Sequence, residues 1–380
     1  NANQILNVLI ITFSVISTAA MILISQYLGA NDRQKVHQLY TLSFVVNTVL
    51  SLVIGAVLLL CSGPIFQLMR VPVELMKESQ QYISIIGGCL FLQAMQLTLS
   101  SFFRSHAMMK ESMIVSVVIN IVNVGGNLVL INGRFGLPAL GVVGAAISSN
   151  LSRIAGLAIM FWIFYKKLEA RFSLRYLRPF PQNMLRQLLH IGLPSGGESL
   201  SYNMTQIFIM TFVNLFGSVS INTKVYASMF AMCSYLFSSA IGQASQVIVG
   251  YLVGAGDLKS TNRQVWYTCK LSMLVSLIVA TALFVLSKPI FGIFTSDPEV
   301  IRLGAVIMLI EIFLEWGRSV NIVMVRCLQA AGDIRFPVTL GILSAWTVAV
   351  LGGYLVGVVA GWGLVGIWIA MACDECIRAV

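Results

Sequence analysis

The sequence predicts an all-α, polytopic membrane protein from three observations: its composition, its long charge-free runs and an internal repeat. Hydrophobic residues make up 58% of the 380 residues, and charged residues make up 10%. A soluble domain carries about 25% charged residues, so this few could not cover the surface of a water-soluble protein of this length. We therefore expect much of the surface to face lipid.

Runs without Asp, Glu, Lys or Arg mark the individual spans. One run lies between Lys224 and Asp257, and another between Arg335 and Asp374. A spanning helix needs about 20 mainly apolar residues. Turn and charge signals then divide the chain into eleven predicted spans, near residues 3–28, 38–62, 80–103, 112–132, 139–165, 188–215, 225–252, 264–286, 301–325, 337–358 and 362–380.

The basic residues orient these spans. The joint 166–187 holds six basic residues against one acid, so the positive-inside rule predicts that it is cytoplasmic. Alternation then gives fourteen basic residues to the cytoplasmic joints and six to the external ones. This orientation of the spans explains the net charge of +10. We therefore expect a multi-pass plasma-membrane protein that binds no nucleic acid.

A repeat with an offset of 225 residues relates the two halves. Residues 28–32 match 253–257, through a shared Gly-Ala-x-Asp, and residues 62–66 match 287–291, through a shared Pro-Ile-Phe. Hydrophobic bias alone would not produce both matches. The sequence therefore predicts two copies of one multi-helix unit.

The repeat predicts two six-helix bundles related by a pseudo-two-fold axis along the membrane normal. The span 188–215 has no counterpart in the first copy, so we expect the first helix of that copy to be missing. The domains are then an amino-terminal bundle at 1–165, a linker at 166–187 and a carboxy-terminal bundle at 188–380. Two such bundles around a central cavity are typical of secondary transporters, and duplication in a passive channel is the alternative.

Acidic residues inside predicted spans are the first candidates for a functional site. Each costs about 2.5–3.5 kcal/mol at bilayer depth and usually has a partner or a role. Glu198 follows a helix-loosening Pro194 and two glycines, and it could bind a cation or a proton, or simply snorkel. Glu311 and Glu315 share one helix face with Arg318, as a titrating pair or as a purely structural ion pair.

Further polar residues extend the candidate set. Asp374 lies in the last span beside Glu375, with Arg378 one helical turn further on. Amide and hydroxyl side chains could line a cavity or form hydrogen bonds between helices, at Asn120, Asn123, Asn127, Ser149, Gln243 and Asn321.

The sequence contains no pattern typical of an enzyme. It lacks a P-loop and a clustered nucleophile and base, so the energy for any transport must come from an ion or substrate gradient. Cys373 and Cys376 have the CxxC spacing, but no second pair accompanies them. We expect no metal site and no cofactor.

Several motifs resemble those of one transporter family. They are Gln26–Asp32, its repeat at Gly250–Asp257, Pro138–Ala146, Ile191–Pro194 and Leu328–Asp333. Together they are similar to motifs of the multidrug and toxic compound extrusion (MATE) transporters, from the second helix of that family to the twelfth.

The resemblance implies a two-lobe exporter of cationic or amphipathic compounds that takes up Na⁺ or H⁺ in exchange. Glu198 matches the acid of the family's seventh helix. The tenth-helix acid of some members aligns with Arg318, so that role is either absent here or moved to Glu311 or Glu315. The fifth-helix motif reads Asn123-x-x-x-Asn127, without the family's carboxylate.

The working hypothesis is therefore a monomeric antiporter in which a surplus carboxylate alternately holds a small-molecule substrate or the coupling ion. One alternative is a flippase for lipid-linked oligosaccharides or other lipids of the same superfamily. It would need a basic cavity, for which Arg104, Arg153 and Arg318 are available. A second alternative is a passive channel or receptor.

Overall fold

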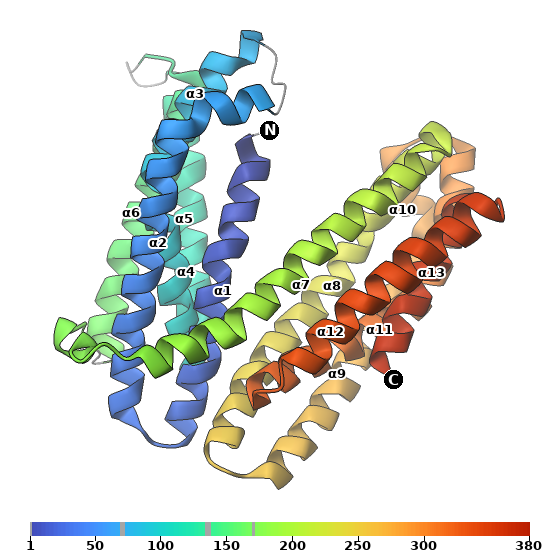
Figure 1. The fold of residues 1–380 in the computed structure, drawn as a ribbon. Coiled ribbons are helices and arrows are strands. Elements are labelled where there is room, and N and C mark those ends of the chain that lie inside the picture. The colour runs from blue at the N-terminus through green and yellow to red at the C-terminus, as the bar shows by residue number, and fades with distance from the viewer. Residues whose placement is uncertain (1, 69–72, 134–137, 169–171) are drawn as a thin grey trace. The chain divides into compact units, whose positions relative to one another are not determined.

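The computed structural model describes residues 2–68, 73–133, 138–168 and 172–380, with their side chains except at 2–8, 65–68, 73–78 and 174. Helix is the only regular secondary structure in these ranges, which confirms the predicted all-α class (Figure 1). The chain forms two compact units, unit 1 (Asn1–Gly196) and unit 2 (Gly197–Val380).

The helices follow the predicted spans closely. Unit 1 contains α1 (Ala2–Gly29), α2 (Arg33–Leu68), α3 (Val73–Gly88), α4 (Leu90–Ser105), α5 (Met109–Leu130), α6 (Gly141–Lys167) and the 3-10 helix η1 (Leu174–Leu177). Helix α7 (Gln182–Asn214) begins in unit 1 and ends in unit 2. Unit 2 continues with α8 (Gly217–Gly254), α9 (Leu258–Val285), α10 (Ser287–Phe294), α11 (Pro298–Ala331), α12 (Arg335–Ser344), the π-helices η2 (Ala345–Gly352) and η3 (Tyr354–Val359), and α13 (Gly363–Ala379).

Seven described helices are long and apolar enough to cross a membrane, and the pair α3–α4, bent by 49°, makes up to eight. The three other predicted spans lie on α7, α11 and α13. Polar side chains interrupt α7, three charges lie close together on α11, and α13 has 17 residues. These three helices do not meet the length and hydropathy expected of a membrane-spanning helix, because they carry polar groups or are short. The count of eleven spans and the pseudo-two-fold relation stay predictions.

The two copies of the Gly-Ala-x-Asp motif form the same turn. Asn31 and Gly256 both have a positive φ, of 56° and 76°. The next residue is Asp32 or Asp257, and its side chain accepts a hydrogen bond from the backbone N–H three residues on, at 3.1 and 2.9 Å. These aspartates begin α2 and α9 as N-caps. The repeat found in the sequence is therefore a repeat of local structure at these positions.

A buried amide joins three helices in the core of unit 1. The Nδ2 of Asn47 on α2 lies 3.2 Å from the carbonyl oxygen of Phe13 and 3.0 Å from Ser17 Oγ, both on α1. It lies 2.8 Å from Thr98 Oγ1 on α4. Asn47 itself is 0% exposed. Since apolar contacts between helices hold little specificity in lipid, such polar contacts help to fix the packing.

The residues that follow α6 pack against unit 1. The ring of Phe172 stacks on Phe164 at 4.6 Å between centroids. Gln38 Nε2 at the start of α2 donates to the carbonyl oxygen of Tyr176 in η1 at 3.2 Å. This part of the predicted linker is therefore held against the ends of α2 and α6.

Helix α11 is the central helix of unit 2 and packs against α8, α9 and α13. Its contact with α13 depends on Gly317. A Cβ at this position would lie 2.6 Å from the backbone nitrogen of Cys376, so only glycine allows the two backbones to come this close. Buried apolar side chains fill the rest of the unit, among them Phe291, Ile307 and Leu314.

Replacing Asn47 by Leu tests the polar core of unit 1. We expect the free energy of unfolding in detergent to fall by about 1–3 kcal/mol, because buried hydrogen-bonding groups on α1 and α4 lose their partner. The control is Asn120→Leu, since Asn120 is exposed and forms no hydrogen bond with other described residues. Equal losses in both variants would contradict a structural role for the Asn47 contacts.

Candidate ion-coupling site in unit 2

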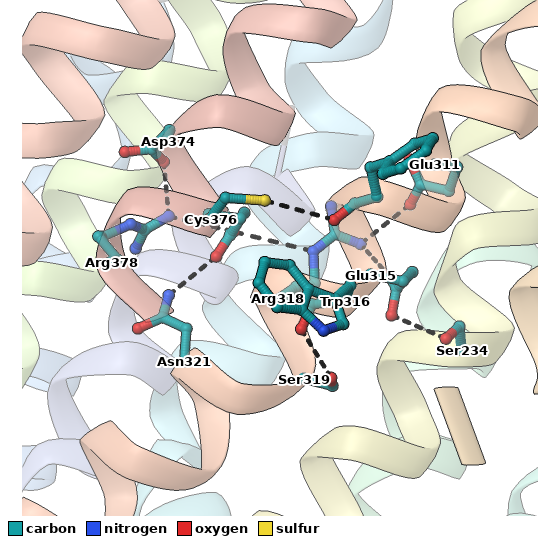
Figure 2. Close-up of polar contacts among 12 residues, drawn as sticks. Ser234, Glu311, Glu315, Trp316, Arg318, Ser319, Asn321, Asp374, Cys376 and Arg378 are labelled. Atoms are coloured by element: carbon teal, nitrogen blue, oxygen red, sulfur yellow. Dashed lines mark hydrogen bonds and ion pairs between the residues drawn. The ribbon is translucent and has the colours of Figure 1, made fainter. Parts of the chain in front are cut away.

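Arg318 lies at the centre of a buried charged cluster on α11. Its Nη1 donates to Glu315 Oε1 at 2.5 Å and to Glu311 Oε1 at 3.2 Å. Figure 2 shows the guanidinium between the two carboxylates. The spacing of these residues along one helix face predicted their proximity, and the structure brings all three together.

Each of these carboxylates receives a second hydrogen bond from another helix. Trp368 Nε1 on α13 donates to Glu311 Oε2 at 2.6 Å, and Ser234 Oγ on α8 donates to Glu315 Oε2 at 2.7 Å. Glu311 is 2% exposed and Glu315 is 0% exposed. Three helices therefore hold the two acids in place.

Helix α13 adds a second group of charges. Arg378 Nη2 donates to Asp374 Oδ2 at 2.6 Å and lies 3.1 Å from Glu375 Oε1. The i, i+4 and i, i+3 spacings place both acids within reach of this arginine. Asp374 also accepts a hydrogen bond from Ser344 Oγ on α12 at 2.6 Å.

Glu375 connects the two groups. Asn321 Nδ2 on α11 donates to Glu375 Oε2 at 2.8 Å, and Arg318 Nε lies 3.8 Å from Glu375 Oε1. Asn321, predicted as a cavity-lining residue, therefore belongs to the charged cluster. The close approach of α11 and α13 at Gly317 makes these contacts possible.

The cluster carries more negative than positive groups. Four carboxylates (Glu311, Glu315, Asp374 and Glu375) face two guanidiniums (Arg318 and Arg378). Fully ionised, it would hold two uncompensated negative charges inside a membrane protein. Such charges are unstable there, so the cluster favours taking up positive charge.

A small cavity adjoins the cluster. It has a volume of about 10 Å³, close to the smallest space that holds one water molecule. Its lining includes Tyr202 on α7 together with Arg318, Asp374 and Glu375. The cavity is large enough for one water molecule beside the cluster and has no room for an organic substrate.

Glu198 on α7 lies apart from these ion pairs. It is half-buried and forms no hydrogen bond or ion pair with another described residue. Arg326 and Arg378 act on it electrostatically from α11 and α13. A Cβ at Gly341 on α12 would lie 3.3 Å from Glu198 Oε1, a tight contact, so the glycine allows α12 to lie close to this carboxylate.

The predicted amide residues of unit 1 connect α5 with α6. Asn123 Nδ2 donates to Ser149 Oγ at 3.2 Å, and Asn127 Nδ2 donates to Asn123 Oδ1 at 3.1 Å. These contacts are hydrogen bonds between and along helices, one of the two roles that the sequence left open. Asn120 is exposed, and Gln243 in unit 2 donates to a serine hydroxyl on its own helix at 3.4 Å.

Sequence reasoning did not select Ser234, Ser344 and Trp368, which are hydrogen-bond donors to the acids. Isolated serine and tryptophan residues are common in membrane helices, so the sequence did not mark these three as part of a site. Glu375 and Arg378 could be found from the sequence, because they lie at helical spacing next to Asp374.

The comparisons with known proteins agree with this architecture. The family model MatE matches residues 1–129 and 194–355. The chain is 36% identical to the uncharacterized transporter YisQ of Bacillus subtilis, over all of this chain and 83% of that protein. It is 25% identical to the probable multidrug resistance protein NorM of the same organism, over 94% of this chain and 80% of that protein.

Solved structures share the fold. The Vibrio cholerae MATE transporter VcmN in its bent form has a TM-score of 0.91 at 19% identity, over 100% of this chain and 85% of that chain. A MOP superfamily transporter from Pyrococcus furiosus has a TM-score of 0.88 at 17% identity, over 99% of this chain and 83% of that chain. With the sequence matches above, the chain belongs to the MatE family of multidrug and toxic compound extrusion transporters.

Proposed function

We propose that this transporter is a secondary active exporter of cationic or amphipathic compounds, coupled to an ion through unit 2. The observation that carries the proposal is the surplus of carboxylates in the buried cluster, four against two guanidiniums. A site with surplus negative charge can hold either a coupling ion or a substrate cation. Its occupancy would change the relative stability of inward- and outward-facing states through differential affinity.

Glu198 is the acid that we assign to direct exchange. The cluster acids each accept at least two hydrogen bonds or ion contacts from the protein, whereas Glu198 accepts none from a described residue. Its carboxylate lies close to Gly341 on α12. A carboxylate without a hydrogen-bond or ion-pair partner among the described residues is the group in unit 2 best able to bind a ligand cation or a proton.

We assign H⁺ rather than Na⁺ as the coupling ion. A hard cation takes several oxygen ligands and loses its water to bind them. Here the oxygens of Glu311, Glu315 and Glu375 already accept hydrogen bonds, and two guanidiniums lie among them. A sodium ion would have to displace those donors. A proton needs no coordination shell and can arrive through the water-sized cavity.

A histidine outside the spans does not supply the proton site. His106 lies in the turn after α4, hydrogen-bonded to Tyr40 Oη. Burial of the imidazole lowers the pKa of His106 to about 4, so this side chain stays neutral near pH 7. We assign the pH response of transport near neutrality to the acids of unit 2 as part of this proposal.

The structure weakens the flippase alternative, because it would need free basic side chains. Arg318, one of the three arginines available for a basic cavity, is enclosed by carboxylates. A passive channel would have no need of a buried acidic cluster. The proposal retains a monomeric protein of the plasma membrane, with residues 166–187 on the cytoplasmic side.

Glu198→Gln tests the exchange role. We expect efflux of a fluorescent organic cation such as ethidium to fall roughly tenfold, about 1.4 kcal/mol in activation free energy, because the variant cannot change charge. The assay uses proteoliposomes with the full-length protein under a pH gradient. The control is Glu299→Gln, an exposed acid in the first turn of α11. Unchanged efflux in Glu198→Gln would remove this residue from the mechanism.

Imposed gradients test the coupling ion. In the same proteoliposomes, an inward pH gradient at equal Na⁺ should drive ethidium efflux. An inward Na⁺ gradient at equal pH should leave efflux at the rate without a gradient. The physical reason is the donor-filled carboxylate cluster, which suits a proton better than a metal ion. Efflux driven by Na⁺ alone would refute the assignment.

Arg318→Gln tests the ion-pair cluster itself. We expect the free energy of unfolding to fall by about 3–5 kcal/mol, because buried carboxylates lose their counter-charge. The double variant Glu315→Gln with Arg318→Gln should recover part of that loss, since it also removes one buried negative charge. The free energy of unfolding of each variant is measured in detergent. Losses that simply add would show that the two residues are not coupled.

A further inference from the structure

A polar groove lies in unit 1 at the end where α1, α2 and α7 meet. It has a volume of about 510 Å³, and its lining includes Tyr27, Lys35, Gln38, Asn183 and Gln187. All of its lining residues belong to unit 1. The groove lies far along the chain from the acids of unit 2, and it takes no part in the coupling proposed above.

The walls of the groove are held in place by contacts between helices. Tyr27 Oη on α1 donates to Gln187 Oε1 on α7 at 3.0 Å. Lys35 Nζ on α2 lies 2.9 Å from Asp32 and 5.3 Å from the centroid of the Tyr27 ring. The ammonium group is thereby positioned at the groove, next to amide side chains that can donate hydrogen bonds.

The segment next to the groove is strongly basic. Arg178 and Arg186 are exposed and form no ion pair with another described residue. Phe180, which lines the groove, is 50% exposed. The positive-inside rule places this joint on the cytoplasmic side, at the ends of α1 and α2 where phospholipid headgroups lie. Free arginines and an exposed aromatic ring together suit a ligand with an anionic head and an apolar tail.

We propose that this groove binds the phosphodiester headgroup of an anionic phospholipid of the cytoplasmic leaflet. The phosphate lies against Lys35 and the amide groups, Arg178 and Arg186 add long-range attraction, and Phe180 contacts the acyl region. Basic pockets at this level of a membrane protein bind such headgroups. A soluble phosphate compound shares the phosphate chemistry, but it would not use an exposed aromatic ring at the membrane surface.

The test measures phospholipid retention by the full-length protein in native mass spectrometry. The probes are dioleoylphosphatidylglycerol, dioleoylphosphatidylcholine at the same mole fraction, and inorganic phosphate. We expect retention of phosphatidylglycerol over phosphatidylcholine. Lys35→Gln should weaken it about fivefold, the factor expected for one lysine at an anionic surface. The control Lys259→Gln removes a lysine from the first turn of α9, outside the groove, and should retain the lipid as wild type does.

A second variant separates shape from charge. Asn183→Trp fills the groove without changing any charge, and we expect it to lose the preference for phosphatidylglycerol as well. Equal weakening by Lys35→Gln and Lys259→Gln would show attraction by the whole basic surface and overturn the site. Full competition by inorganic phosphate would assign the groove to a soluble phosphate compound and overturn the lipid proposal. Drug efflux plays no part in these measurements, so their failure leaves the proposed function untouched.

Discussion

The need to balance buried charge governs the structure of unit 2. A guanidinium inside a membrane protein is stable only when acceptors surround it, and Arg318 receives carboxylates from both α11 and α13. That requirement fixes the neighbours of α11. Gly317 must lack a side chain so that α13 can approach, and Ser234 and Trp368 must face inward to complete the hydrogen bonds of the acids.

The same arrangement gives unit 2 its chemistry. Two arginines hold four acids together, yet they do not neutralise all of them. A cluster that was fully balanced would be a structural ion-pair network with no reason to exchange a proton. The proposed proton coupling rests on three features: the surplus of carboxylates, the adjoining water-sized cavity, and Glu198, which has no ion-pair partner among the described residues.

In unit 1, the contacts described between helices are formed by uncharged polar side chains. Its core contacts run through Asn47, Ser17 and Thr98, and its α5–α6 contact runs through Asn123 and Ser149. In these contacts amide and hydroxyl groups form hydrogen bonds between helices. The two units share turns, as the matching conformations at Asp32 and Asp257 show, but they differ in the chemistry of their interiors.

Much of the fold could be predicted from the sequence, because lipid imposes a strong and local rule on composition. Apolar runs with Pro and Gly at the joints indicated the helices, and the Gly-Ala-x-Asp matches revealed the repeated turn, whereas the direction of the spans stays a prediction. The spacing of Glu311, Glu315 and Arg318 also predicted their contact, since neighbours on one helix face are set by helical geometry. Contacts between helices follow no such rule. Only the tertiary structure decided that Trp368 donates to Glu311, that Asn321 donates to Glu375 and that Glu198 has no hydrogen-bond or ion-pair partner among the described residues. These features depend on how helices distant in sequence pack together.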